Sequence, residues 1–351
     1  MVKLTSKQEK IAIYILKRRN AQASEVFKDL IDGGEKVSLI TVKRDLSEMS
    51  KSGVLSVSGS GRSVSYGLSL FGRIFFDVDT KAYCSIDLDD RYGFRGYDFD
   101  LFSSIPNNIF DDDDLMRIER ATESYKSRVG DVSKTIQKRE LERFVIEMSW
   151  KSSKIEGNTY TLLDTERLIL ENKKAADKTE KETQMILNHK EAFEYIHNHP
   201  AIFKNVSKKC LVDLHDILTK DLGIDKGLRK DMVGISGSIY MPLDNIYQID
   251  DAVGQLMETI SRIENVHAKA LISLLGVSYI QPFNDGNKRV GRFIANAILL
   301  SYGFPPLSYR SVGEDEYREA ILVFYELNSI IPFKKIFVSQ YEFTTDNYTV
   351  L

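Results

Sequence analysis

Residues 281–292 read Gln281-Pro282-Phe283-Asn284-Asp285-Gly286-Asn287-Lys288-Arg289-Val290-Gly291-Arg292. Apolar residues at helical spacing precede this stretch over 268–279 and follow it over 293–300, which predicts a tight loop feeding a helix N-terminus. Backbone N–H groups and the helix dipole make such a place an anion site, and Gly286 lets the backbone approach a phosphate closely. Arg289 and Arg292 can clamp further phosphate oxygens, and Asp285 can hold a hard cation such as Mg²⁺. The stretch therefore predicts a polyphosphate site with Mg²⁺.

The same stretch resembles the signature of the Fic family, also called Fido: His-x-Phe-x-(Asp/Glu)-Gly-Asn-(Gly/Lys)-Arg-x-x-Arg. The similarity extends over roughly residues 140–340 and includes Gly227-Leu228-Arg229 and Tyr240-Met241-Pro242. It implies a mainly α fold, a helical Fic-domain bundle with a short β-hairpin flap. It also implies transfer of AMP from ATP to a Ser, Thr or Tyr hydroxyl of a protein. The positions that fit the signature are Phe283, Asp285, Gly286, Asn287, Lys288, Arg289 and Arg292.

The resemblance also assigns roles to single positions. Asp285 would bind the metal, and the loop at Gly286, Asn287 and Lys288 would cradle the α- and β-phosphates. Arg289 and Arg292 would contact the β- and γ-phosphates, and with Asn287 they would form the catalytic set around position 281. A hairpin over 233–241 would hold the target by strand addition, through Gly234, Ile235, Ser236, Gly237, Ser238, Ile239 and Tyr240.

The first position of the signature departs from the family, because Gln281 stands where the family has its general-base histidine. A glutamine amide accepts a hydrogen bond but takes no proton near neutral pH. A general base contributes about 10²–10⁴ in rate, so activity is expected to be weak or absent. His267, fourteen residues earlier and roughly 20 Å away along a helix, lies too far to replace it. Tyr279, with a side-chain pKa of about 10, is a poor base.

A second match lies upstream, in Ser152-Ser153-Lys154-Ile155-Glu156-Gly157. It fits the family's inhibitory pattern (Ser/Thr)-x-x-x-Glu-(Gly/Asn), in which the glutamate pairs with the second signature arginine, here Arg292. The resemblance thus makes Ser152, Glu156 and Gly157 an inhibitory element that competes with the γ-phosphate for one guanidinium. The residues alone also fit a simpler interpretation, a helix C-terminus capped by Gly157.

The first 68 residues predict a separate unit. Helices are expected after Thr5-Ser6, after Ser24 until Gly33-Gly34, and after Ser38 or Thr41, followed by strands at 54–57 and 63–66. This pattern resembles a DeoR-type winged helix-turn-helix, which implies duplex DNA contacts by Lys43, Arg44 and Arg62. The alternative is a small protein-binding module with solvated cations.

Charge and composition complete the expected organisation. Residues 1–70 carry a net charge of +5 and residues 71–114 a net charge of −7. The run Asp111-Asp112-Asp113-Asp114 is expected to open a helix, where carboxylates favour the dipole. We expect a winged helix over 1–68, an acidic linker-like extension over 69–115 and a helical domain over 116–351.

The two cysteines suggest no disulfide framework, and the lack of an apolar span predicts a cytoplasmic protein with no membrane partner.

Two functions follow from the residues and the resemblance. The first is a self-inhibited protein adenylyltransferase that uses ATP and Mg²⁺ and acts on a protein hydroxyl. The second is an ATP-binding module without turnover that controls a winged-helix DNA-binding regulator. A purely structural helical domain is disfavoured, because Asp285, Arg289 and Arg292 together form an anion loop that such a domain does not need.

Overall fold

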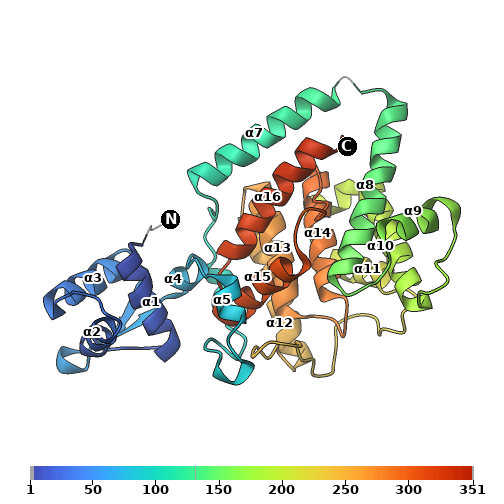
Figure 1. Cartoon of the computed structure of the whole chain (residues 1–351). Helices are drawn as coiled ribbons and strands as arrows, with labels where there is room; N and C mark the ends of the chain where they lie inside the picture. The colour runs from blue at the N-terminus through green and yellow to red at the C-terminus, as the bar shows by residue number, and fades with distance from the viewer. Residues whose placement is uncertain (1–3, 131, 350–351) are drawn as a thin grey trace.

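The computed structural model describes residues 4–130 and 132–349, and Figure 1 shows a small N-terminal group of helices beside a larger helical bundle. Short helices at α4 (Leu70–Ile74), α5 (Thr80–Cys84) and α6 (Leu101–Ser104) connect the two. The bundle consists of α7 (Asp112–Val129), α8 (Lys134–Ile155), α9 (Leu162–Glu171), α10 (Glu180–Asn198), α11 (Lys208–Leu218), α12 (Ile246–Arg262), α13 (Val266–Ile280), α14 (Asn287–Ser301), α15 (Glu314–Leu327) and α16 (Ile331–Asn347). No helix within the described residues is both long and apolar enough to cross a membrane.

The N-terminal unit contains three helices, α1 (Ser6–Arg18), α2 (Ala23–Asp32) and α3 (Leu39–Lys51). Strands β1 (Leu55–Ser58) and β2 (Ser65–Leu68) follow and pair antiparallel. Thr5 and Ser38 cap α1 and α3 through their hydroxyl oxygens, as predicted. The predicted cap at Ser24 is wrong: the cap is Gln22, two residues earlier, because Glu25 Oε2 accepts from the backbone N–H of Gln22 at 2.7 Å and fixes the helix start there.

The acidic segment 69–115 lies against the bundle through buried polar contacts. Arg73 Nη1 donates to Asn328 Oδ1 at 3.1 Å, and Tyr83 Oη donates to Glu326 Oε2 at 2.7 Å. The aspartate run opens α7 as predicted, since Asp111 Oδ1 accepts from the backbone N–H of Asp114 at 2.9 Å. Figure 1 shows α7 running along α16, which it contacts.

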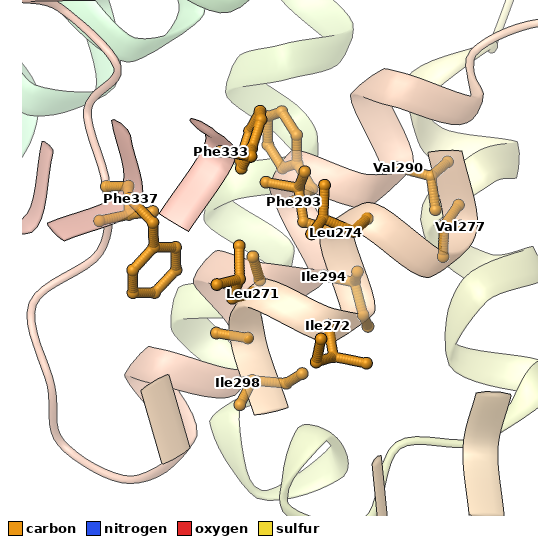
Figure 2. Close-up of a cluster of buried hydrophobic side chains, with 14 of the residues drawn as sticks. Leu271, Ile272, Leu274, Val277, Val290, Phe293, Ile294, Ile298, Phe333 and Phe337 are labelled. Carbon is orange, nitrogen blue, oxygen red and sulfur yellow. The ribbon is translucent and has the colours of Figure 1, made fainter. Parts of the chain in front are cut away.

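Helix α13 forms the centre of the bundle because its sequence is apolar on every face. Its main neighbour is α14, and Figure 2 shows their side chains interlocking, with α16 contributing from one side. The close approach requires Gly291, where an added Cβ would lie 2.9 Å from the carbonyl oxygen of Leu274. The labelled contacts come from Leu271, Ile272, Leu274, Val277, Val290, Phe293, Ile294, Ile298, Phe333 and Phe337.

The predicted β-hairpin over residues 233–241, called the flap below, is wrong as a pair of strands. Within the described residues, β1 and β2 form the only sheet. The flap has one turn, in which Ser238 N donates to Ile235 O at 3.1 Å. Its two arms do not pair because outside groups take the flap's backbone: Glu326 Oε1 accepts from Ile239 N, and Met241 N donates to Arg95 O.

Candidate functional site

The loop between α13 and α14 is built by two residues with left-handed backbones. Gln281 ends α13 with φ 51° and ψ 57°, and Gly286 precedes α14 with φ 82°. Asn287, the first residue of α14, closes the loop: its Oδ1 accepts from Phe283 N at 2.9 Å and its Nδ2 donates to Phe283 O at 2.8 Å. Phe283 is fully buried and anchors the turn. The N-terminus of α14 thus lies at the wall of a cleft, where a helix N-terminus favours an anion.

Gly286 is required there for steric reasons as well. An added Cβ would lie 3.1 Å from Thr219 Cγ2 and 3.3 Å from Arg289 Nη2, and the positive φ would strain any other residue. The role of Gly286 in letting the backbone approach a phosphate stays a prediction.

Two of the three predicted cations are buried. Arg289 is 2% exposed, donates through Nη1 to Leu218 O at 3.3 Å and lies 3.2 Å from Asp285 Oδ2. Arg292 is fully buried and donates through Nε to Ser152 Oγ at 2.9 Å. Lys288 remains partly exposed, and all three positive charges act on the carboxylate of Glu156.

Glu156 neutralises part of this charge. Its Oε1 lies 2.7 Å from Arg292 Nη2, and its Oε2 lies 3.1 Å from Lys288 Nζ. Burial alone would raise the pKa of the carboxyl, but the nearby charges of Arg292 and Lys288 outweigh it and lower the pKa of Glu156 to about 2. The same pairing, together with Tyr317, raises the pKa of Arg292 against the effect of burial.

The end of helix α8 sets the position of Glu156. The helix ends at Ile155, and Gly157 has φ 92° and donates its N–H to Lys154 O at 2.9 Å. The predicted glycine cap and the predicted contact of Glu156 with Arg292 therefore occur together in one turn. Arg318 of α15 completes the arrangement by donating Nη2 to Ile155 O at 3.0 Å.

Gln281 points its amide into the loop. Its Nε2 donates to Ser278 O at 2.6 Å, and its Oε1 accepts from Asn287 Nδ2 at 2.9 Å. Gln281 thus orients Asn287 and offers no basic atom. The two alternatives considered for a base are unsuitable: Tyr279 is buried, which raises its pKa to about 12, and His267 is buried against Phe304 and Tyr341.

Glu156, Gln281, Asp285 and Lys288 line a cleft of about 480 Å³, whereas the buried Arg289 and Arg292 are not part of its lining. One wall comes from the loop between Gln281 and Lys288, and another comes from the flap arm at 233–236. Helix α15 supplies a third wall, and Glu156 lies at one end. The α15 residues in the cleft are Arg318, Ile321, Leu322 and Tyr325.

The sequence reasoning missed this third wall. The four α15 residues follow an i, i+3, i+4, i+7 pattern, so periodicity marks them as one helix face. It does not tell which face meets the cleft. His215 was also missed: its ring stacks on Phe283 with centroids 3.9 Å apart, and its Nε2 lies 3.1 Å from Asp285 O. Burial lowers the pKa of His215, so it supports the loop as a neutral ring.

The predicted flap residues divide between two environments. Gly234, Ile235 and Ser236 line the cleft, whereas Ile239 and Tyr240 are buried away from it. Tyr240 Oη donates to Tyr279 O at 2.9 Å. Ser236 and Gly237 form the turn between these arms, which the N–H of Ser238 closes on Ile235 O.

The N-terminal candidates lie outside the cleft. Lys43 and Arg44 are exposed on α3, and Arg62 is exposed at the tip of the β1–β2 hairpin. Arg44 Nε lies 3.9 Å from Glu48 Oε1 on the same helix face. The structure thus brings together the candidates of the loop and the end of α8. It leaves Lys43, Arg44 and Arg62 outside the cleft, on α3 and the β1–β2 hairpin.

The donor set of the cleft suits a magnesium ion that arrives with phosphates. Asp285 supplies one carboxylate, 69% exposed, beside the loop backbone. Mg²⁺ is commonly held by one or two carboxylates together with substrate phosphates and water. Among residues 4–130 and 132–349 no cluster of three His, Cys, Asp or Glu ligands exists for a metal held by protein alone.

Comparison with known proteins agrees with this architecture. Residues 205–299 match the model of the Fic/DOC family. The chain is 30% identical over 189 residues to a protein adenylyltransferase Fic of Nematostella vectensis, covering 52% of this chain and 44% of the relative. A protein adenylyltransferase Fic of Culex quinquefasciatus is 30% identical over 209 residues, covering 58% and 41%. The matches thus span less than half of each relative's length.

Two solved structures share the fold. A Fic domain containing signaling protein from Bacteroides thetaiotaomicron superposes with a TM-score of 0.54 at 20% identity, covering 66% of this chain and 94% of that chain. Fic-1 from C. elegans superposes with a TM-score of 0.57 at 19% identity, covering 67% and 71%. With the loop and α14 described above, these findings show a chain with the fold of solved Fic proteins, in which residues 205–299 are similar to the Fic/DOC family.

Proposed function

We propose that the cleft binds ATP with Mg²⁺ and transfers AMP to a hydroxyl group of a protein, slowly, and that Glu156 holds this activity off. The observation that carries the proposal is a cleft of about 480 Å³ lined by Glu156, Asp285 and the α14 N-terminus, with the buried guanidinium of Arg292 lying 2.7 Å from Glu156. The names of the relatives, protein adenylyltransferase, support the choice of nucleotide and reaction.

In the proposed reaction the acceptor oxygen forms a bond to the α-phosphorus, and the bond from that phosphorus to the β-phosphate oxygen breaks. Pyrophosphate leaves, and the hydroxyl proton passes to solvent. Asp285 would hold the Mg²⁺, which would neutralise phosphate charge. The backbone at Gly286–Lys288 and the guanidinium of Arg289 would position the phosphates, which supplies much of the catalysis in such transfers.

Gln281 explains why the proposed transfer is slow. Both ends of its amide are engaged, with Ser278 O and with Asn287 Nδ2, so it preserves the loop without accepting a proton. The loss of a general base is worth about 10²–10⁴ in rate. Positioning and charge stabilisation remain in place.

Glu156 supplies the proposed inhibition. A γ-phosphate that approaches Arg292 competes with a carboxylate already 2.7 Å from the guanidinium. A charge-assisted contact of this kind is about twice as strong as a neutral hydrogen bond. The cleft therefore binds ATP in the productive pose only when the turn after α8 moves.

Gln281 also favours a second candidate, a Fic module that binds ATP without turnover and controls a DNA-binding unit. In that case residues 1–68 would act as a winged helix, with Lys43, Arg44 and Arg62 on the duplex. Their exposure on α3 and at the hairpin tip fits this arrangement. Binding of duplex DNA that weakens steeply with salt, and that weakens further in Lys43→Ala, is expected if this unit reads DNA. Salt-independent binding, or none, would favour a protein-binding role.

The deciding experiment is label transfer from ATP labelled at the α-phosphate, with Mg²⁺, onto the protein itself and onto host lysate. Four forms are compared: the native chain, Glu156→Gly, Gln281→His and the double variant. We expect weak label in Glu156→Gly and about 10²–10⁴ times more in the double variant. Label only when histidine is present would favour the binding module, and no label in any form would overturn the transferase proposal.

A further inference from the structure

Glu326 is a buried carboxylate beneath the flap. It is fully buried near the end of α15. Its Oε1 accepts from Ser238 Oγ at 2.7 Å and from Ile239 N at 3.1 Å, and its Oε2 accepts from Tyr83 Oη at 2.7 Å. One side chain therefore holds both a flap hydroxyl and a flap backbone amide.

Arg91 provides the matching cation. Its side chain is 7% exposed, and its Nη1 lies 3.4 Å from Glu326 Oε1. The same Nη1 donates to the flap carbonyl Gly237 O at 2.8 Å. Its Nη2 donates to Cys84 O and Ile86 O, both at 3.1 Å. These two bonds fix the guanidinium to the segment just before Arg91 in the chain. An uncompensated charge at this buried place would be costly, so each partner needs the other.

The ion pair anchors one arm of the flap and leaves the other free. On the 237–241 arm, Gly237 O, Ile239 N and Met241 N are bound by Arg91, Glu326 and Arg95 O respectively. On the 233–236 arm, the backbone groups of Val233, Gly234 and Ser236 make no hydrogen bond with any described residue. Gly234 and Ser236 are also exposed, and the whole arm lines the cleft.

We infer that Arg91 and Glu326 are positioning residues for target docking: they fix the 237–241 arm so that the 233–236 arm is presented to an extended target segment beside the nucleotide cleft. This inference rests on the proposed function, in which the flap receives the target. Because an extended segment binds through main-chain hydrogen bonds, the unbound backbone at 233–236 is the edge it would join. Neither Arg91 nor Glu326 belongs to the cleft itself.

The first test is amide hydrogen exchange of the full chain without any ligand. Glu326→Gln keeps the size of the side chain and removes its charge, and Ser238→Ala removes a single flap contact. We expect the amides of Ile239 and Met241 to exchange about tenfold faster in Glu326→Gln, because a buried charge-assisted contact is lost. Amides within α14 should exchange as in the native chain, and Arg91→Lys should retain part of the flap's protection.

Glu147→Gln is the matched control. Glu147 is also a buried carboxylate that accepts from an arginine, Arg310 Nη1 at 2.8 Å, and from a tyrosine, Tyr348 Oη, but it lies away from the flap. It should leave flap exchange unchanged. Equal exchange at 239 and 241 in Glu326→Gln, Ser238→Ala and the native chain would overturn the inference.

A second measurement separates this inference from the proposed function. Label transfer onto lysate proteins is compared in the Glu156→Gly/Gln281→His background with and without Glu326→Gln. We expect the label to fall severalfold while ATP affinity stays unchanged. An unchanged label together with faster flap exchange would reject the docking role, whereas absence of label in both forms would reject the transferase proposal and leave the exchange result standing.

Discussion

Glu156 Oε1 lies 2.7 Å from Arg292 Nη2, which joins the turn after α8 to the buried second turn of α14. Arg292 also donates to the hydroxyl and the carbonyl of Ser152, so the end of α8 occupies most of the guanidinium. Lys288 takes the other carboxylate oxygen of Glu156. The contact thus places one anion from the protein where the proposed function requires a phosphate.

Replacing Glu156 by glutamine is expected to increase ATP affinity by about tenfold or more, because one charge-assisted contact to Arg292 is lost. The affinity can be measured by calorimetric titration of ATP with Mg²⁺. Trp150, the only tryptophan of the chain, lies six residues before Glu156 on α8 and provides a fluorescence signal for movement of this turn.

Glu140→Gln serves as control, since Glu140 pairs with Arg143 on the same helix at 2.7 Å and does not line the cleft. It should leave ATP affinity unchanged. Equal affinities of the native chain and Glu156→Gln would remove the inhibitory interpretation.

The role of Asp285 predicts a specific magnesium dependence. In the Glu156→Gln background, removing Mg²⁺ should weaken ATP binding by about tenfold or more, and Asp285→Asn should abolish most of that difference. Asp225→Asn is the control, because Asp225 contacts Asn284 of the same loop at 3.3 Å without lining the cleft. Full magnesium dependence in Asp285→Asn would show that the ion binds elsewhere.

The packing of α13 against α14 predicts opposite effects for two glycine substitutions. Gly291→Ala should lower the free energy of unfolding by about 1–3 kcal/mol, because its Cβ would press on Leu274 O at 2.9 Å. Gly254→Ala, on the exposed face of α12 with nothing within 4 Å, should raise it by about 0.5–1 kcal/mol. Chemical denaturation measures both, and a neutral Gly291→Ala would contradict the packing argument.

Two buried histidines predict a loss of stability on mild acidification. Burial lowers the pKa of His267 to about 4, and burial, helped by Arg289, lowers the pKa of His189 to about 3. Between pH 6.5 and 4 these two histidines therefore bind protons in the unfolded chain but stay neutral in the folded chain. The free energy of unfolding falls as the pH falls. At pH 5 the loss is about 2 kcal/mol for each histidine relative to neutral pH.

Denaturation curves at pH 7 and pH 5 measure this loss, and pH 5 stays above the usual pKa of carboxyl groups. His267→Gln should reduce the loss of stability between pH 7 and pH 5 by about 2 kcal/mol, the contribution of one histidine. Phe304→Leu, which disturbs a ring in contact with His267 without removing a titrating group, should lower stability equally at both pH values. An unchanged pH dependence in His267→Gln would contradict the assignment.

Local features of the fold could be predicted from the sequence because they depend on neighbouring residues. The caps at Thr5 and Ser38, the aspartates that open α7 and the loop before Asn287 are all of this kind. Each uses a hydrogen bond or backbone angle fixed within four residues. The same holds for the turn at Gly157.

The errors and omissions depend on contacts between distant segments. The flap sequence predicts a hairpin because apolar residues flank Ser236-Gly237-Ser238. In the structure, Glu326 and Arg95 bind the backbone groups that strand pairing would use. The face of α15 in the cleft and the ring of His215 beneath Phe283 were missed for the same reason. Sequence spacing does not encode which distant groups meet.

Val323 and Leu327 of α15 belong to the same hydrophobic cluster as Ile11, Val26 and Leu46 of the N-terminal helices. Glu326, between them in sequence, reaches the flap, and Arg318, two turns earlier, reaches the end of α8. Helix α15 thus contacts the N-terminal helices, the flap and the turn after α8 at the same time. The helix that packs against the N-terminal core is therefore also the helix that forms one wall of the cleft.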